Sequence, residues 1–222
     1  MKVRGAAARP AARKPNAPAA VTIMALPSME NAKPMPPRTN THITETRIES
    51  EAVYDGGFLK VRRDTVALPD GRRATREYIL HPGAVVIIAQ PDDDHVIMER
   101  QYRYPVQRVI TEFPAGKLEP GEPPLLCARR ELLEETGYSA DEWRHAGDMH
   151  LAVGYSDEII HIFFARGLTA GPPRLDHDEF LDVEIMKVDD VLQACRNGGI
   201  TDAKSLSCAL WLQNVRSGAW KL

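Results

Sequence analysis

The apolar run Gly83–Ala89 is the feature that most restricts how this chain can fold. Its seven residues read GAVVIIA and form the longest unbroken apolar run of the 222-residue sequence. A membrane-spanning helix needs about 18 such residues, so no transmembrane helix is expected. A short run without polar alternation is typical of a β-strand that is buried on both faces. We therefore expect this strand to lie inside a sheet that other elements cover on each side.

The segments around this run supply further strands. The chain becomes strand-like from Thr41, and Phe58–Leu68 and Ala74–Leu80 lie on either side of the turn sequence Pro69-Asp70-Gly71. This pattern predicts a hairpin, and its interleaved charged residues indicate one face that is solvated or paired with something else. Later strands are expected over Val96–Arg103, over Leu151 and Ile159–Ala165, and over Asp182–Val188.

Two helices are clearly indicated, together with a shorter one over Val188–Arg196. Pro123–Thr136 has proline in its first positions and Gly137 just after its end, which are typical helix boundaries. A second helix is expected to begin at Thr201 as its N-cap. It carries Ala203, Leu206, Leu210 and Val215 at helical spacing. Strands and helices in mixed order predict an α/β or α+β sandwich.

The net charge of −3 hides two unlike parts. Residues 1–40 carry seven Lys and Arg and one acid, a charge of +6, and the remaining residues carry −9. We expect residues 1–40 to be disordered, because this Pro- and Ala-rich segment has few large apolar residues to offset its ordering entropy. A transit peptide and a nucleic-acid-binding tail are the alternatives, but the sequence predicts no amphipathic helix here and no aromatic residue precedes Tyr54. We favour a segment without function, or a true start at Met24 or Met29.

The three cysteines, Cys127, Cys195 and Cys208, are widely spaced and form no CxxC pair. This argues against a disulfide framework or a zinc ribbon and is typical of a reducing compartment, so a cytoplasmic location is expected.

An acidic helix face is the first sign of chemistry. Glu131, Glu134 and Glu135 fall within an arc of about 100° on the predicted helix, where like charges repel. The alternative reading is a solvated acidic face. Carboxylate oxygens are, however, the ligands that Mg²⁺ prefers, and Arg130 can orient a carboxylate by a forked hydrogen bond. The preceding loop, Gly116–Glu122, lets the backbone approach closely at its glycines.

These residues resemble a known motif. Gly116, Glu122 and the run Arg130-Glu131-Leu132-Leu133-Glu134-Glu135-Thr136-Gly137-Tyr138 match the Nudix box G-x5-E-x7-R-E-U-x-E-E-x-G-U. Tyr138 stands where the pattern prefers a small aliphatic residue, at a core-packing position. The resemblance implies a Nudix-type α/β/α sandwich with a mixed sheet, over residues 81–222. An N-terminal antiparallel strand subdomain is expected before it, over residues 41–80.

The likeness extends to the ADP-ribose pyrophosphatase branch of the family. It is carried by Gln101-Tyr102-Arg103, Glu112–Gly116, Arg76-Glu77-Tyr78 and Gly154–Glu158, whereas Val153 stands where this branch often has proline. The branch implies a homodimer that exchanges N-terminal strands and builds its substrate site partly at the interface. Neither nucleic acid nor a membrane is an expected partner.

The implied activity is hydrolysis of the diphosphate bond of ADP-ribose, to AMP and ribose 5-phosphate, with Mg²⁺ or Mn²⁺ as cofactor. A closely related nucleoside diphosphate sugar is an equal candidate. The alternatives are another nucleoside diphosphate derivative, such as a sugar nucleotide or NADH, and a non-catalytic Nudix-fold module that senses ADP-ribose.

The resemblance also implies the roles of single residues. The metal ligands would be Glu131, Glu135, Glu134 and the backbone carbonyl of Ala115. Arg130 would brace the carboxylates, and Glu122 would orient them from the second layer. Glu179 is our choice for the proton acceptor, with His177 and Glu158 as alternatives, so the catalytic set comprises Glu179, Glu134 and Arg130.

For the substrate, Arg103 is expected to contact the diphosphate. Arg76 and Glu77 would reach the nucleotide or ribose across a dimer interface, and Glu112 would support the site from behind. Phe58 or Tyr54 could stack on the adenine, and the sequence does not select between them.

Overall fold

The computed structural model describes residues 40–175, 177 and 179–222. The disorder expected for residues 1–40 lies outside the described residues, except for Asn40. The strands are β1 Thr46–Asp55, β2 Lys60–Ala67, β3 Arg73–Leu80, β4 Ala84–Ala89, β5 His95–Arg103, β6 Arg108–Glu112, β7 Ala115–Lys117, β8 Tyr138–Met149, β9 Ile160–Ala170 and β10 Leu181–Lys187. The helices are α1 Pro124–Thr136, α2 Val188–Asn197 and α3 Ala203–Arg216, with a short 3-10 turn at Tyr104–Val106.

Strand β4 is the centre of the fold. All six of its residues are buried, as the apolar run predicts. It pairs in parallel with β9, with Ala84 opposite Ile160, and antiparallel with β7 on its other side. Strand β8 continues this mixed four-stranded sheet beyond β9, in the order β7-β4-β9-β8.

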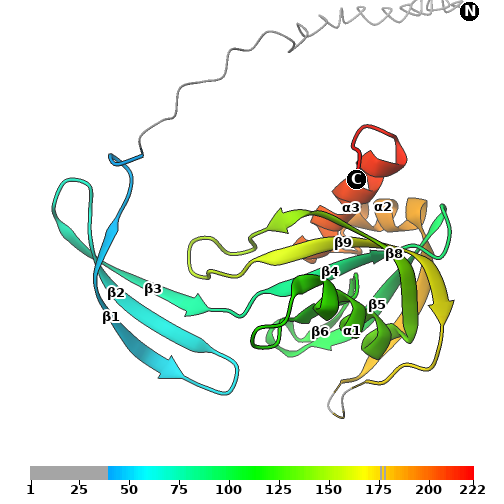
Figure 1. The fold of residues 1–222 in the computed structure, drawn as a ribbon, viewed down its shortest axis with the longest axis horizontal. Helices are drawn as coiled ribbons and strands as arrows, with labels where there is room; N and C mark the ends of the chain where they lie inside the picture. Colours follow the sequence, from blue (N-terminus) through cyan, green and yellow to red (C-terminus); the bar gives the residue numbers. More distant parts are fainter. Residues whose placement is uncertain (1–39, 176, 178) are drawn as a thin grey trace, which may run out of the picture. The chain divides into compact units, whose positions relative to one another are not determined.

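Alternate residues of β4 point into two separate cores. Val85 and Ile87 pack with Ala128 and Leu132 of α1 on one face. Val86 and Ile88 lie in the other core, which includes residues of α2 and α3. The sheet is therefore covered by α1 on one side and by α2 and α3 on the other (Figure 1), and the predicted α/β/α sandwich is confirmed.

A second sheet, in the order β10-β5-β6, completes the sandwich. Strand β5 follows β4 directly in the chain but pairs with β10 and β6. This sheet places Glu99 of β5 opposite Glu112 of β6. Two acidic residues on neighbouring strands are thereby brought together.

Some sequence-based boundaries were wrong. Strand β8 was not expected. It lies at the edge of its sheet, and its many polar residues and its bulge interrupt the alternation of apolar and polar residues that marks a strand. Leu151 lies in the connection after β8 rather than in a strand. The N-cap of α3 is Asp202, not Thr201, because the Asp202 side chain accepts a hydrogen bond from the Ser205 amide.

The apolar positions of α3 also differ from the expected set. Leu206 and Leu210 are exposed, whereas Cys208 and Leu212 are buried. The helix therefore turns a different side to the core than the sequence spacing indicated.

The predicted hairpin is confirmed as β2 and β3, with Lys60 opposite Leu80, and β1 adds a third antiparallel strand. Every residue of β1 is exposed. The end of β3 joins the connection between β8 and β9, where the Ile79 amide donates to the Tyr155 carbonyl over 2.8 Å. Within the part of the chain that the structure describes, no helix combines the length and the apolar character needed to cross a membrane.

Helix α1 has the predicted ends. Pro123 is its N-cap, and Gly137 ends it with a φ of +74°, a left-handed conformation that favours glycine. A side chain at Gly137 would also meet the Gly171 carbonyl oxygen, 2.3 Å from the added Cβ. The Gly171 amide donates to the Gly137 carbonyl, and the Arg174 amide donates to the Glu134 carbonyl. The segment after β9 is thereby attached to the end of α1.

The packing of α1 yields a stability prediction. Leu132 is fully buried against the sheet, so Leu132→Ala should lower the free energy of unfolding by about 2–5 kcal/mol. Leu126 lies on the exposed side of the same helix, and Leu126→Ala should change it by less than about 0.5 kcal/mol. Urea unfolding of both variants measures the difference. Equal destabilisation would contradict the assigned orientation of α1.

Candidate functional site

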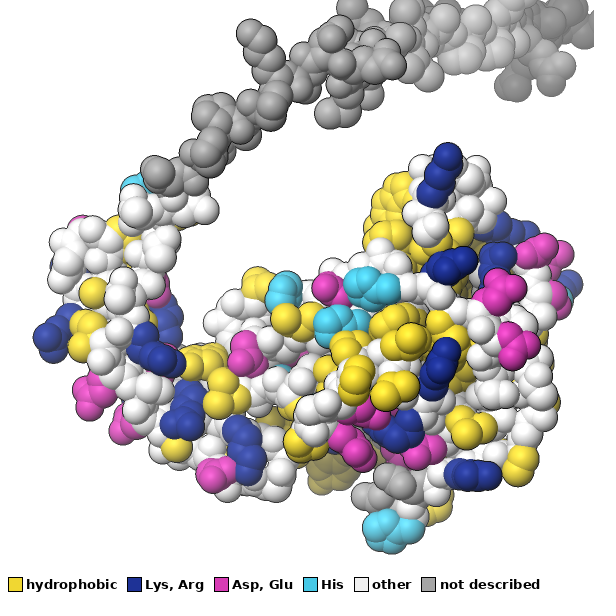
Figure 2. Space-filling model, viewed as in Figure 1, with side chains coloured by type: hydrophobic (Ala, Val, Ile, Leu, Met, Phe, Trp, Pro, Cys, Tyr) yellow, Lys and Arg dark blue, Asp and Glu magenta, His cyan; other side chains and the backbone are white. Residues whose placement is uncertain are grey.

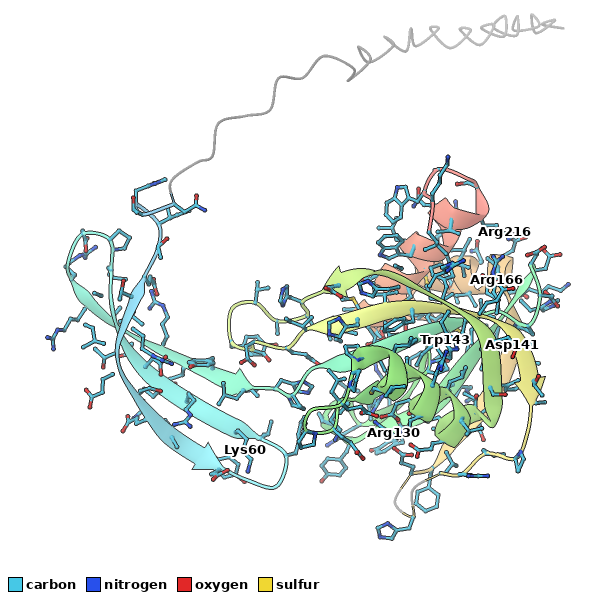
Figure 3. All side chains as sticks on the ribbon, in the orientation of Figure 1. Lys60, Arg130, Asp141, Trp143, Arg166 and Arg216 are labelled. Atoms are coloured by element: carbon cyan, nitrogen blue, oxygen red, sulfur yellow. The ribbon has the colours of Figure 1, made fainter. Side chains whose placement is uncertain are left out.

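A cavity of about 960 Å³ lies where α1, the strand β7 and the second sheet meet. Its charged lining comprises Lys60, Arg103, Lys117, Glu119, Arg130, Glu131, Glu134, Glu135, Glu158, Glu179, Asp202 and Lys204. Figure 3 labels Arg130 at this place, and Figure 2 shows acidic side chains around a basic one there. One face of α1 thus turns its carboxylates into the cavity.

Gly116 allows the carboxylate of Glu131 to lie against the backbone of β7. A Cβ added at Gly116 would lie 1.8 Å from the Glu131 Cδ atom, so any larger residue there would displace this carboxylate. Burial raises the pKa of Glu131 to about 7, although Arg130 acts in the opposite direction. The glycine of the motif is therefore required by the position of the glutamate, fifteen residues later.

Arg130 holds several of these carboxylates in place. Its Nε and Nη2 atoms donate a forked pair of hydrogen bonds to Glu122, over 3.0 and 2.9 Å. Its Nη1 atom lies 2.9 Å from Glu131 and 3.0 Å from Glu134. The hydrogen bonds from Arg130 lower the pKa of Glu122 to about 2, so this side chain is a carboxylate at neutral pH. This is the arrangement that a bracing role for Arg130 and a second-layer role for Glu122 would require.

Glu135 lies deeper than its two helix neighbours. Its Oε2 atom accepts a hydrogen bond from the Ala115 amide over 3.2 Å. Burial, followed by the charges of Glu99 and Glu131, raises the pKa of Glu135 well above the ordinary value. Burial and the charge of Glu112 likewise raise the pKa of Glu99 to about 8. Among the described residues, none forms a hydrogen bond with the buried Oε1 atom of Glu99.

These carboxylates fit a divalent cation. Glu131 and Glu135 lie close together in a buried position, where the negative charge of neither carboxylate is fully balanced by neighbouring cations. Glu99 adds a third acid beside Glu135. All the donors are oxygen atoms, which Mg²⁺ and Mn²⁺ prefer over nitrogen and sulfur. Glu131, Glu135 and Glu134 could therefore hold such a cation beside the backbone of Ala115.

Another part of the cavity wall is basic. The Arg103 Nε atom donates to Glu112 over 2.7 Å, and the Lys204 Nζ atom contacts the other oxygen of the same carboxylate. Lys204 also donates to the Asp202 side chain over 3.0 Å. Glu112 is 2% exposed, so it lies behind the two cations and fixes their positions from the protein side. The described side chains thus place cationic and carboxylate walls around one cavity.

Sequence reasoning missed several residues of this site, among them Glu99, Asp202 and Lys204. Glu99 follows three fully buried apolar residues of β5. Because charged residues are rarely buried without a partner, an acid at the end of such an apolar run could have indicated a site residue. Lys204 carries no comparable signal, because its role depends on Glu112, which is distant in sequence.

The remaining predicted residues fall into two groups. Glu158 and Glu179 line the cavity, as does Phe58, whose ring lies 4.6 Å from the Lys117 ammonium. Arg76 and Glu77 are not among the lining residues of the described chain. They form ion pairs with other side chains, Arg76 with Glu45 and Glu77 with Arg63.

His177 and Tyr54 also lie outside the described lining. The structure thus gathers the metal and phosphate candidates at one cavity but leaves the nucleotide candidates Arg76 and Glu77 on the N-terminal sheet. The roles of all these residues remain predictions. Tyr138, the departure from the motif, packs against the core on the α1 side of the sheet, as expected for its position.

Comparisons with known proteins agree with this geometry. Residues 79–206 match the NUDIX domain, and residues 45–79 match the nucleoside diphosphate sugar hydrolase N-terminal domain. The ADP-ribose pyrophosphatase of Bacillus subtilis (strain 168) is 38% identical over 173 residues, which cover 77% of this chain and 94% of that protein. The methanol dehydrogenase activator of Bacillus methanolicus is 39% identical over 171 residues, which cover 76% of this chain and 92% of that protein.

A solved structure, described as the crystal structure of an ADP compounds hydrolase, has the same fold. It aligns with a TM-score of 0.70 at 24% sequence identity, over 80% of this chain and 97% of that chain. The NUDIX domain match covers more than half of the chain, and its motif residues form the carboxylate wall described above. The chain therefore belongs to the Nudix hydrolase family and carries the N-terminal domain of nucleoside diphosphate sugar hydrolases.

Proposed function

We propose that this protein hydrolyses the diphosphate bond of ADP-ribose, giving AMP and ribose 5-phosphate, with Mg²⁺ or Mn²⁺ as cofactor. The observation that carries the proposal is the pairing of a carboxylate wall with the basic wall of Arg103 and Lys204 around one cavity. The similarity to the ADP-ribose pyrophosphatase of Bacillus subtilis supports this substrate over other nucleoside diphosphates.

The two walls suit a diphosphate ester. Arg103 and Lys204 offer N–H donors to phosphoryl oxygens, and Glu112 keeps both side chains oriented toward the cavity. When bound at Glu131, Glu135 and Glu134, a divalent cation would neutralise phosphoryl charge and lower the pKa of a coordinated water. In the reaction an O–P bond forms from water, the bridging P–O bond breaks, and the water loses a proton to a base.

Glu179 is the group we assign to accept that proton. It lines the cavity, and its charge raises the pKa of both Glu131 and Glu135, which supports a position close to the carboxylate wall. Glu158 also lines the cavity but faces His81, with 3.6 Å between the two side chains. His177 remains a second alternative.

A homodimer would complete the site. The N-terminal sheet leaves Ile48, Val53 and Tyr54 exposed, and a three-stranded sheet with so little buried surface needs a partner to be stable. A second copy covering this sheet would remove these side chains from water. It would also bring Arg76 and Glu77 toward a cavity, as expected for residues that act across an interface.

The substrate is tested by a panel of nucleoside diphosphates with Mg²⁺, followed by product identification. ADP-ribose should give AMP and ribose 5-phosphate at a higher kcat/KM than sugar nucleotides or NADH. Glu135→Gln should lower kcat about a hundredfold or more, because metal ligation supplies several kcal/mol of transition-state stabilisation. Glu142→Gln, at an exposed position of β8, should have the wild-type rate. Tight binding of ADP-ribose without turnover would instead support a sensor, and faster turnover of another nucleotide would replace the proposed substrate.

The proton acceptor is tested by comparing Glu179→Gln, Glu158→Gln and His177→Gln under the same conditions. Glu179→Gln should lower kcat by about 10²–10⁴ with a smaller change in KM, because a general base acts in the transition state. The other two variants should retain most of the wild-type kcat. A normal kcat for Glu179→Gln would eliminate it as the base.

The raised pKa values of the buried acids predict a pH-dependent stability in EDTA. Glu131 and Glu99 have pKa values of about 7 and 8 in the folded protein, above the ordinary value of 4.5. At a pH between the ordinary pKa of 4.5 and these raised pKa values, the folded state binds more protons than the unfolded chain. The melting temperature should therefore fall as pH rises from about 5 to 8. Added Mg²⁺ should restore stability most at the higher pH, and Glu99→Gln should flatten the decline in EDTA. A melting temperature that rises over this range in EDTA would contradict the burial of these charges.

A further inference from the structure

A second group of metal-ligating side chains lies away from the cavity, on strands β8 and β9. It consists of His145, Asp148 and His161. The Asp148 Oδ1 atom lies 2.8 Å from His145 Nε2 and 2.7 Å from His161 Nδ1. None of the three belongs to the described lining of the hydrolase cavity. Two imidazoles therefore converge on one carboxylate oxygen outside the site that the Nudix motif builds.

The backbone brings these side chains onto one face. Asp148 lies directly opposite His161, and His145 lies opposite Phe163, two residues further along β9. In a regular strand, residues three apart point to opposite faces. The register shifts between His145 and Gly147, so the extra residue of this bulge returns Asp148 to the side of His145. The cluster is thus a product of the bulge.

We propose that His145, Asp148 and His161 bind one transition-metal ion of the Zn²⁺ class. Two imidazole nitrogens and a carboxylate oxygen are the donors that Zn²⁺ commonly takes, whereas Mg²⁺ prefers an all-oxygen set. The ion would therefore differ in class from the cation that fits the Glu131 and Glu135 carboxylates.

The geometry needs little adjustment to accept the ion. The three ligand atoms all lie within 4.8 Å of one another. A tetrahedral Zn²⁺ with bonds of about 2.0–2.1 Å would hold its ligand atoms about 3.3 Å apart, which small side-chain rotations reach. His145 and Asp148 are about half exposed, so an ion has access from solvent and can keep a water ligand.

A bound ion would link β8 and β9 at the base of the loop that joins them. That loop carries Leu151 and Glu158 to the hydrolase cavity, and His150 Nδ1 lies 3.0 Å from the Glu158 carbonyl oxygen. An ion that binds only the folded chain raises its stability by mass action. The expected effect of the site is therefore on the stability of this part of the sheet.

Calorimetric titration of Zn²⁺ into the full chain, in excess Mg²⁺ that occupies the carboxylate site, tests the proposal without measuring hydrolysis. One Zn²⁺ should bind per chain and raise the melting temperature. His161→Gln and Asp148→Asn should each weaken binding by about tenfold or more, since loss of even a supporting hydrogen bond around a metal has an effect of this size. Co²⁺ in place of Zn²⁺ should give an absorption spectrum that both variants lose.

His95 provides a matched control. It also contacts an aspartate, with 2.8 Å between its Nδ1 atom and Asp92, but this pair does not belong to the three-residue cluster. His95→Gln should bind Zn²⁺ as the wild type does. The proposal is overturned if Zn²⁺ does not bind, if His161→Gln binds it unchanged, or if Glu131→Gln rather than the cluster variants abolishes binding.

Discussion

Three carboxylates and one guanidinium meet on one face of α1, and the candidate active site depends on this contact. Arg130 donates to Glu122 and lies within 3.0 Å of oxygen atoms of Glu131 and Glu134. Like charges at helical spacing repel, so without Arg130 these side chains would spread into solvent. With it, they stay together at the edge of a cavity, where a divalent cation can complete the charge balance.

The rest of the fold keeps that contact in place. Strand β4 is buried on both faces and carries α1 on one side, so the helix cannot shift without disturbing the core. Gly116 on β7 leaves room for Glu131, and the Ala115 amide binds Glu135. On the basic wall of the cavity, Glu112 lies behind Arg103 and Lys204 and holds both side chains in place. Strands of both sheets therefore hold the charged side chains that line the cavity.

Local sequence signals predicted the parts of the fold that depend on neighbouring residues. The ends of α1, the hairpin turn and the buried strand β4 all follow from short patterns, and the Nudix motif lies within one loop and one helix. Lys204 and Asp202 could not be predicted in this way, because they meet Glu112 only through packing of α3 against the sandwich. Strand β8 and its bulge escaped prediction because an edge strand with polar residues on both faces has no clear alternation. The His145 cluster depends on that bulge and on the pairing of β8 with β9, so no local sequence pattern predicts it.

Glu179 lies close to an element that is anchored independently of α1. Leu181, two residues after Glu179, begins β10 and pairs with Gln101 of β5. Two residues, fully extended, span at most about 7 Å, so the second sheet fixes the position of Glu179. Helix α1 carries the carboxylate ligands, whereas a different layer of the fold holds the proposed base. The distance between ligands and base is therefore set by how α1 packs beside the second sheet.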